Sequence, residues 1–536
     1  MAQNQTFVIN WIYKQMSARN KNWLLGFLND KLHTPTWLFI LLIIVFILRI
    51  PSFFEPYSYG DEMIYLTLGE AIRRGIPLYS GIHDNKPPLL YILAAIAGSL
   101  FWFKAILAIW SLVTIFLFWK LSIAMFPSGP ETLKGRRPKK ESLQKISTII
   151  FALLITIPLL EGNIINAELF MIAPTIIAFL IILTRELNFK NIFTAGLFFS
   201  FATLFKIPAI FDIPAVIILW LVIPKKYSLV TLKKIGLRVI YLGLGFIIPI
   251  ALTFVWYTLR GAFKEYLIAA YLQNVGYLSS FRPGDVAKPF LERNGPLLLR
   301  FGIASLGLLI MFLKRRKLSP QFIFITSWLL MTLFAVTLSE RPYPHYLIQS
   351  VGPISLLLGI LFTLRNIEQL LVILPLTLTL YVPVYYRFWH YPTLPYYTRF
   401  VNFALGKITK DQYLSTFGGQ VQRNYKIANY ILSLTKPEEK VFIWGDSSPI
   451  YALSRRLPPG KYVADYHIKD FSNLVEVMNN LRNSPPVLIV ILPNSNPFSD
   501  LIIFLRNNYG LVEIIDSAQI WKLLGPNLRG LNNYGQ

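Results

Sequence analysis

One stretch early in the chain gathers side chains that can do acid–base and phosphate chemistry. It carries two adjacent carboxylates, a phenol, a third carboxylate and an ammonium group: Asp61, Glu62, Tyr65, Asp84 and Lys86. A carboxylate can take the proton of an incoming hydroxyl or amine. A cation can hold phosphate oxygens, and a sugar phosphate whose charge is held leaves without a covalent nucleophile. The stretch therefore favours transfer chemistry on a phosphate-linked substrate.

The adjacent acids also have a structural interpretation. Residues 64–72 place apolar side chains at helical spacing opposite a polar face, which predicts a helix lying at a membrane surface. Asp61 and Glu62 would stand at its beginning, where a helix N-terminus favours anions. Catalysis and helix capping both remain open from the residues alone.

Other polar groups lie far along the chain. They are an acidic turn from Glu161 to Glu168, the cations Lys104 and Lys206, and a turn from Arg341 to Tyr346 that contains His345. Each has an ordinary alternative: a solvated turn, lysines that snorkel to a membrane surface, and a structural histidine. No His or Cys spacing predicts a structural zinc site, and there is no P-loop.

The elements that must position these groups are membrane spans. Hydrophobic residues make up 54% of the chain and charged residues 15%, with a mean hydropathy of +0.50, whereas soluble domains carry about a quarter charged residues. About eleven apolar blocks are candidates for crossing a bilayer. They are 36–50, 105–126, 146–160, 169–184, 191–205, 207–223, 235–256, 297–313, 321–338, 346–363 and 369–386. A twelfth block, 88–103, is short and follows Pro87-Pro88, so we expect a juxtamembrane or re-entrant segment there.

Charge sets the expected orientation. With the N-terminus inside, the inner loops are much richer in Lys and Arg than the outer loops, as the positive-inside rule requires. We therefore expect a multi-pass protein of the plasma or inner membrane, with residues 1–35 cytoplasmic and the loop 51–104 outside. The net charge of +25 follows this loop pattern, so a nucleic-acid partner is not expected. The chain has no cysteine, which excludes disulfides and thiolate chemistry.

The chain beyond residue 386 changes character, and we expect an extracytoplasmic α/β domain over 387–536. An aromatic cluster from Tyr385 to Tyr397 indicates an interfacial belt. Predicted strands at 440–444, 487–492 and 510–515 then alternate with predicted helices at 421–434, 471–482 and 499–508. This alternation predicts a small layered domain with a mostly parallel sheet.

At this point the chain resembles a known family. Asp61-Glu62 after the first span, followed by Tyr65, Gly75 and Asn85-Lys86-Pro87-Pro88-Leu89, resembles the polyprenyl-phosphate-dependent glycosyltransferases of the integral-membrane GT-C fold. The nearest groups are bacterial glycosyltransferase family 39 proteins, which are similar to protein O-mannosyltransferases and lipid A aminoarabinose transferases. Looser matches are Glu161 through Glu168, Phe205-Lys206 and Arg341 through Tyr346.

The resemblance implies a 36–386 catalytic domain that transfers a sugar from a polyprenyl-phosphate donor, with inversion, to a lipid, glycan or protein acceptor outside the cytoplasm. Membrane lipids would be further partners. Asp61 would be the general base, and substrate-binding roles would fall to Glu62, Tyr65, Asp84, Lys86, Glu168, Lys206, Arg341, His345 and Tyr346. No cofactor is implied with certainty, although Asp61, Glu62 and Glu168 offer oxygen ligands for a divalent cation. The alternatives are a transporter of a lipid-linked glycan, since buried charges also mark transport paths, and a membrane scaffold.

Overall fold

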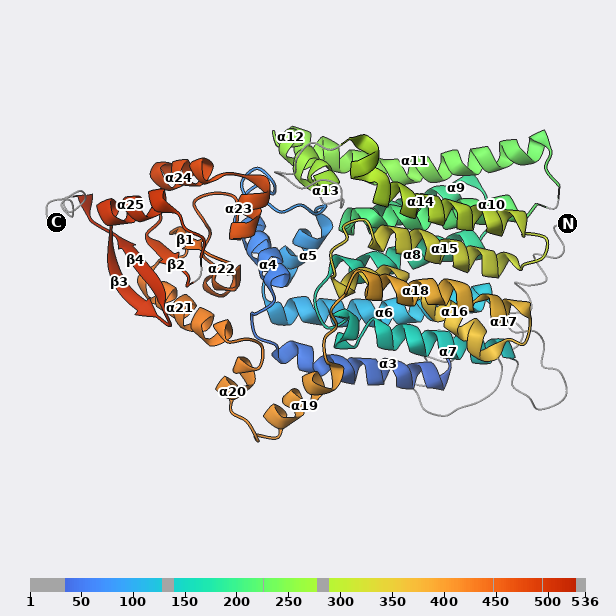
Figure 1. Cartoon of the computed structure of the whole chain (residues 1–536), viewed down its shortest axis with the longest axis horizontal. Coiled ribbons are helices and arrows are strands. Elements are labelled where there is room, and N and C mark those ends of the chain that lie inside the picture. The colour runs from blue at the N-terminus through green and yellow to red at the C-terminus, as the bar shows by residue number, and fades with distance from the viewer. Residues whose placement is uncertain are drawn as a thin grey trace.

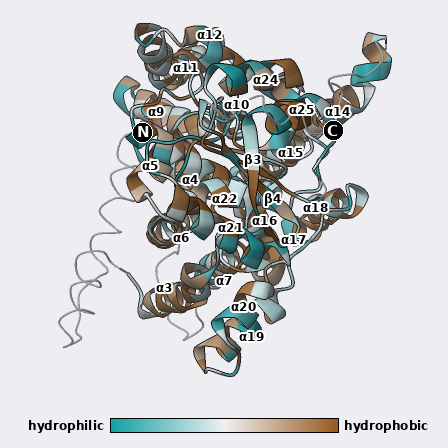
Figure 2. Cartoon of the chain, turned by 90° about the vertical axis from the view of Figure 1, so that its left-hand side faces the viewer, coloured by the Kyte–Doolittle hydropathy of each residue, from teal (hydrophilic) through white to brown (hydrophobic). Residues whose placement is uncertain are grey.

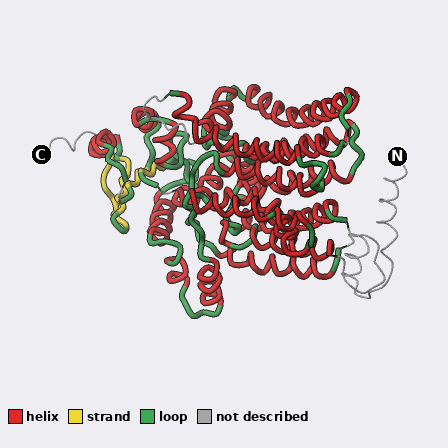
Figure 3. The backbone as a smooth tube through the Cα atoms, turned by 45° about the vertical axis from the view of Figure 1, so that its right-hand side comes forward, coloured by secondary structure: helices red, strands yellow, loops and turns green. Residues whose placement is uncertain are grey.

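The computed structural model describes residues 34–127, 139–224, 226–276, 289–446, 448–493 and 495–526. The predicted cytoplasmic segment 1–35 lies outside this part of the chain except for its last two residues. Helices lying side by side form the larger part of the molecule, and a smaller part with a β-sheet sits at one end (Figures 1 and 3).

Helices lie at all eleven positions where apolar blocks predict spans. They are α3 (Thr36–Arg49) with η1 (Ile50–Phe54), α6 (Leu100–Met125), α7 (Lys139–Leu154), α8 (Ala167–Thr184), α9 (Phe189–Phe205), η3 (Ile207–Asp212) with α10 (Ile213–Val222), α11 (Leu229–Leu259), α14 (Phe290–Leu313), α15 (Pro320–Val336), η5 (Pro344–Ser350) with α16 (Val351–Thr363), and α17 (Ile367–Leu371) with α18 (Ile373–Tyr385). Within the described residues, seven helical segments are long and apolar enough to cross a membrane, and three shorter ones are apolar. The fold is that of a multi-pass membrane protein.

The block 88–103 does not span, as predicted. Residues Leu89–Ala97 form α5, whose nine residues cover about 14 Å, less than half of a bilayer core of about 30 Å. Gly98 ends this helix in a left-handed conformation, and α6 begins at Leu100, five residues before the predicted start of its span.

Helix α4 (Gly60–Arg73) packs closely against α5 in the same loop. A Cβ atom at Gly69 would lie 2.6 Å from backbone atoms of Ala94 and Ala95, so only glycine permits this approach. Asp61 and Glu62 occupy the first turn of α4, and no side chain caps its N-terminus.

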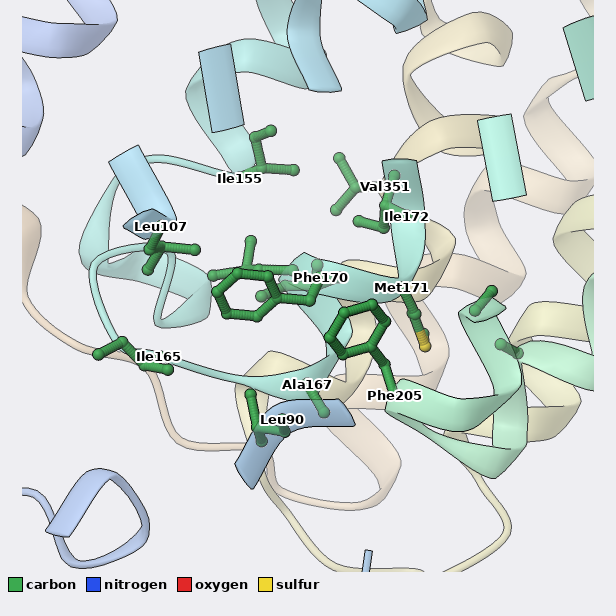
Figure 4. Close-up of a cluster of buried hydrophobic side chains, with 14 of the residues drawn as sticks. Leu90, Leu107, Ile155, Ile165, Ala167, Phe170, Met171, Ile172, Phe205 and Val351 are labelled. Atoms are coloured by element: carbon green, nitrogen blue, oxygen red, sulfur yellow. The ribbon is translucent and has the colours of Figure 1, made fainter. Parts of the chain in front are cut away.

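An apolar cluster fixes the ends of several helices below this loop. Figure 4 shows Phe170 of α8 beside Phe205 of α9, and their rings stack with centroids 5.6 Å apart. Leu90 of α5 and Leu107 of α6 belong to the same buried core. Helices α5, α6, α8 and α9 therefore share one apolar core.

Further short elements lie between the long helices or between the last of them and the C-terminal part. They are η2 (Pro158–Leu160), α12 (Phe263–Tyr266), the π-helical η4 (Leu267–Leu272), α13 (Gln273–Gly276), α19 (Thr393–Ala404) and α20 (Lys410–Ser415). Figure 2 looks onto the end of the bundle covered by the tail, and there the hydrophobic α3 contrasts with the hydrophilic α20 and α21.

The C-terminal part is a small α/β layer, as predicted. It contains α21 (Gln420–Leu434), β1 (Val441–Trp444), α22 (Ser448–Ser454), α23 (Asp465–Phe471), α24 (Leu474–Asn483), β2 (Leu488–Ile491), α25 (Ser499–Asn508), β3 (Tyr509–Ile515) and β4 (Ala518–Leu523). The prediction of a mostly parallel sheet was wrong. The order is β1-β2-β4-β3, and only β1 and β2 pair in parallel. The difference comes from β4, which was not predicted and which inserts antiparallel between β2 and β3.

The C-terminal part docks on the loop that holds α4 and α5. The Ser448 hydroxyl donates a hydrogen bond to the Gly60 carbonyl at 3.0 Å, and the His83 amide donates to the Lys461 carbonyl at 2.8 Å. Arg74 donates to the carbonyls of Pro437 and Arg455. We call this end of the bundle the capped end. It is also the end at which the candidate residues lie.

Candidate active site

Asp61 is the most accessible of the predicted carboxylates at the capped end. Its side chain is 36% exposed. The Tyr65 hydroxyl, one turn later on α4, donates a hydrogen bond to Asp61 Oδ2 at 2.9 Å, and Lys86 Nζ lies 3.8 Å from the same oxygen. The Lys86 ammonium also stands 5.0 Å from the centre of the Tyr65 ring. A phenol and a cation therefore orient one carboxylate oxygen.

Asp84 provides a second, buried carboxylate for the same lysine. Its Oδ2 lies 3.7 Å from Lys86 Nζ, and its Oδ1 accepts a hydrogen bond of 2.7 Å from the Asn85 amide. Burial acts to raise the pKa of Asp84, but Lys86, His467 and hydrogen bonds from Tyr91 and the Asn85 amide together outweigh it, so that this pKa lies below its ordinary value. The Asp84 carboxylate is thus ionised at neutral pH, and Lys86 is held between two negative charges.

A second cluster forms where α8, α9 and η5 meet. Lys206 follows the last residue of α9, pairs with Glu168 in the first turn of α8 and lies 4.0 Å from the centre of the Tyr346 ring. His345 pairs with Glu161, and its Nε2 lies 3.8 Å from Glu168 Oε1. The predicted residues from three distant segments therefore converge.

Arg341 lies near this second cluster in sequence. It is half-buried in the turn between α15 and η5, four residues before His345.

The two clusters act on each other electrostatically. Burial lowers the pKa of Lys206 and Glu168 opposes this effect. The charges of Lys86 and Asp61 also act on that pKa, in opposite directions. The two cations and the Asp61 carboxylate are therefore within electrostatic reach of one another.

A largely apolar cavity of about 470 Å³ opens beside Lys206. Glu168, Lys206 and Tyr346 line it at one side; much of the remaining lining is apolar and includes Phe211, Val275, Leu297, Phe334 and Val336. Such a cavity suits a ligand with a hydrocarbon chain and a charged head.

Glu62 lies in a different environment from its neighbour Asp61. It is 1% exposed, its Oε1 lies 2.5 Å from Lys104 Nζ, and it accepts a hydrogen bond from the Ile165 amide at 2.6 Å. Burial raises the pKa of Glu62, although Lys104 acts to lower it. Lys104 also donates to Glu55 at 2.8 Å. This network fixes α4 to α6.

Sequence reasoning missed two residues. Glu55 lies directly beyond η1, at the end of the first span, where an acidic side chain could have been noted. His467 approaches Asp84 from α23, with 3.7 Å between Nε2 and Oδ1. No local pattern could have revealed that contact, because 383 residues separate the two along the chain.

The three carboxylates considered for a divalent cation do not fit a shared metal site. Asp61 faces Lys86, Glu62 faces Lys104 and Glu168 faces Lys206. Among the described residues no three His, Asp or Glu side chains are grouped as metal ligands.

Comparison with solved structures identifies the fold. The chain is similar to the crystal structure of ArnT from Cupriavidus metallidurans bound to undecaprenyl phosphate, with a TM-score of 0.53 and 10% identity, covering 92% of this chain and 98% of ArnT. The apo structure of the same protein gives a TM-score of 0.53 and 11% identity, over 92% of this chain and 99% of ArnT. No protein-family model and no curated protein sequence matches the chain. The fold is therefore of the GT-C type with a small C-terminal α/β part.

Proposed function

We propose that the protein is an inverting glycosyltransferase that moves a sugar from a polyprenyl-phosphate donor to a lipid, glycan or protein acceptor. One observation carries the proposal: the partly exposed Asp61 carboxylate pairs with Lys86 at 3.8 Å, within electrostatic reach of Lys206, which lines an apolar cavity. A base, phosphate-binding cations and room for a lipid chain are the parts that this reaction needs.

The donor would bind with its prenyl chain in the apolar cavity and its phosphate between Lys206 and Lys86. An ammonium is a strong point charge for phosphate oxygens. Tyr346 would hold Lys206 in place through its ring, and His345 and Arg341 would border the phosphate. The bound undecaprenyl phosphate in ArnT, which has this fold, supports a polyprenyl-linked donor.

The transfer step balances with these groups alone. The acceptor hydroxyl oxygen attacks the anomeric carbon from the face opposite the phosphate, and the bond between that carbon and the phosphate oxygen breaks. Its electron pair leaves with the polyprenyl phosphate, whose charge Lys86 and Lys206 neutralise. Asp61 takes the proton of the hydroxyl. The Tyr65 hydrogen bond to Oδ2 directs the other oxygen of Asp61 toward the acceptor.

Membership of glycosyltransferase family 39 and an extracytoplasmic site both belong to this proposal. The first rests on the motifs around Asp61 and Lys86. The second rests on the loop charges, which assign the capped end to the outer face. Glu62 would serve the reaction indirectly by fixing the first turn of α4.

Asp61→Asn tests the proposal directly. Membranes containing the full chain are incubated with a panel of polyprenyl-phosphate sugars, and glycosylated products are identified by mass spectrometry. We expect Asp61→Asn to lower the transfer rate by about 10² to 10⁴-fold, the usual contribution of a general base. Asp500→Asn is the matched control, because Asp500 also lies in the first turn of a helix but is exposed in α25.

Two results would overturn this assignment. Full transfer by Asp61→Asn removes Asp61 as the base. Movement of labelled lipid-linked sugar across proteoliposomes, with no acceptor glycosylated, would identify a transporter instead.

A further inference from the structure

His467 is a buried histidine that the C-terminal part brings to the candidate site. It lies in α23, is 6% exposed, and places its Nε2 3.7 Å from Asp84 Oδ1. Asp84 is in turn 3.7 Å from Lys86, which is 3.8 Å from Asp61. A continuous line of polar groups thus runs from the C-terminal part to the proposed base.

The surroundings of His467 hold its ring firmly. The ring meets Tyr466 edge-on with centroids 4.5 Å apart and lies 5.6 Å from Phe471. Phe471 also contacts the ring of His83, the residue before Asp84, and the His83 amide bonds to the Lys461 carbonyl. The segment 461–471 therefore packs against the part of the loop 51–104 that contains His83 and Asp84.

Two polar atoms at this junction are incompletely satisfied. In the part of the chain that the structure describes, Oδ2 of Asp84 and Nδ1 of His467 are buried without a hydrogen-bond partner. A buried carboxylate oxygen in this situation depends on nearby charges and dipoles for its stability. The Lys86 ammonium supplies a charge near Oδ2 of Asp84, the Tyr91 hydroxyl hydrogen-bonds to the same carboxylate, and the imidazole of His467 supplies a dipole near Oδ1.

We propose that His467 is a positioning residue: it holds Asp84 so that the Lys86 ammonium stays midway between Asp84 and Asp61, where it can bind an anionic lipid phosphate. The inference rests on the proposed function for the identity of that phosphate. His467 itself touches neither the donor nor the acceptor in this arrangement.

The expected effect of His467 on phosphate binding follows from the position of Lys86 between two carboxylates. The ammonium is almost equidistant from the two carboxylates. Without His467 the buried Asp84 would depend more strongly on its remaining partners, Lys86 among them, because a buried carboxylate is costly unless charges and hydrogen bonds compensate it. We therefore expect Lys86 to shift toward Asp84 and away from Asp61. The expected consequence is weaker phosphate binding rather than a slower chemical step.

Protonation of His467 should have a related effect. The charged or titratable groups that act on it are Asp84, Lys86, Asp61, Asp470 and His83. Burial lowers the pKa of His467, so the ring is neutral at pH 7. An imidazolium formed in acid would pair with Asp84 and repel Lys86, so phosphate binding should weaken as the pH falls.

Undecaprenyl phosphate binding to the full chain in detergent measures this role without any transfer reaction. His467→Ala should weaken binding at pH 7.5 by about tenfold, the size of one lost buried polar contact. His467→Gln keeps a polar group beside Asp84 but cannot titrate. This variant should bind undecaprenyl phosphate nearly as tightly as the wild type at pH 7.5. As the pH falls, its affinity should decrease less than that of the wild type, because glutamine cannot take up a proton. His390→Gln, at an exposed histidine, is the matched control and should behave as the wild type.

Histidine NMR gives a second readout. The chain has five histidines, and the signal lost in His467→Gln identifies that ring. Asp84→Asn should lower the pKa of His467 further, since the carboxylate favours the imidazolium. An unchanged His467 titration in Asp84→Asn, or wild-type binding by His467→Ala, would overturn the inference.

The two proposals fail separately. If undecaprenyl phosphate binds and depends on His467 but no sugar is transferred, only the glycosyltransferase assignment is lost. If transfer requires Asp61 but the affinity for undecaprenyl phosphate does not depend on His467, only the positioning role is lost.

Discussion

The Lys104 ammonium lies 2.5 Å from Oε1 of Glu62, and both side chains are shielded from solvent. Glu62 directly follows the partly exposed Asp61, yet the two point into different surroundings because successive residues on an α-helix are about 100° apart. One acid of the pair faces the candidate site, and the other locks α4 against α6 through Lys104 and Glu55. The adjacent carboxylates therefore combine a chemical role, as proposed, with a structural one.

Lys104→Met should destabilise the protein strongly. The substitution leaves Glu62 and Glu55 in the buried network without their cation, and breaking a buried ion pair costs about 3–5 kcal/mol. Thermal unfolding in detergent measures the loss. Lys120→Met is the control, because Lys120 lies in the same helix over the rings of Phe116 and Trp119. Equal losses from both substitutions would contradict the assignment, whereas adding Glu62→Gln to Lys104→Met should restore part of the stability.

Lys206→Gln should weaken the binding of undecaprenyl phosphate. Losing a charged hydrogen bond costs about 1.5–3 kcal/mol, which corresponds to about 10 to 150-fold in affinity. Lys190→Gln serves as the control, since Lys190 is exposed near the beginning of α9 and Lys206 directly follows its end. Titration of both variants at low and moderate salt gives the comparison. Equal affinities for the two variants would place the phosphate elsewhere.

Ser339→Trp should obstruct the apolar cavity. Ser339 lines the cavity from the turn after α15, so an indole there takes space without replacing a residue of the helix core. We expect the affinity for long-chain polyprenyl phosphates to fall by about tenfold or more, because the displaced prenyl carbons lose their apolar contacts. Ser433→Trp, on the exposed face of α21, should have no effect. Unchanged binding in Ser339→Trp would exclude this cavity as the prenyl site.

We expect the protein to lose stability between pH 7 and pH 5 because His83 is buried in its neutral form. Burial lowers the pKa of His83 to about 4 from an ordinary value of 6.5. Between these values the unfolded chain binds a proton that the folded chain does not, so stability falls as the pH falls through this window. The loss between pH 7 and pH 5 is about 2 kcal/mol. His83→Gln should reduce the difference in thermal stability between these pH values, and His390→Gln should not. His467 acts in the same direction, so part of the pH dependence should survive in His83→Gln.

The sequence predicts the membrane fold well because its signals are local. Runs of apolar residues locate each span, although the helix ends differ from the predicted bounds by up to about seven residues, and the block before Gly98 is too short to cross. Asp61, Tyr65 and Lys86 lie within one short loop, so their association could be expected from spacing and residue type. The groups near Glu168, Lys206 and His345 could be assigned to the same side once the spans were known.

The remaining features depend on contacts between distant segments. Whether Glu62 faces substrate or protein is decided by Lys104 and Glu55, which lie on other elements. Strand β4 was not predicted because the turn that joins it to β3 contains no glycine. Asp516 and Ser517 form this turn, and both have positive φ angles although they carry side chains. The approach of His467 to Asp84 requires the whole bundle to be folded first.

The docking of the C-terminal part on Gly60 and His83 also sets an order of assembly. Residues 448–471 emerge from the ribosome after all eleven bundle segments, yet they complete the surroundings of a loop made near the start. Domains generally fold as they are synthesised. The face of α4 and α5 that the C-terminal part contacts therefore stays uncovered during most of translation. A chain interrupted after α18 would lack the residues that complete this junction.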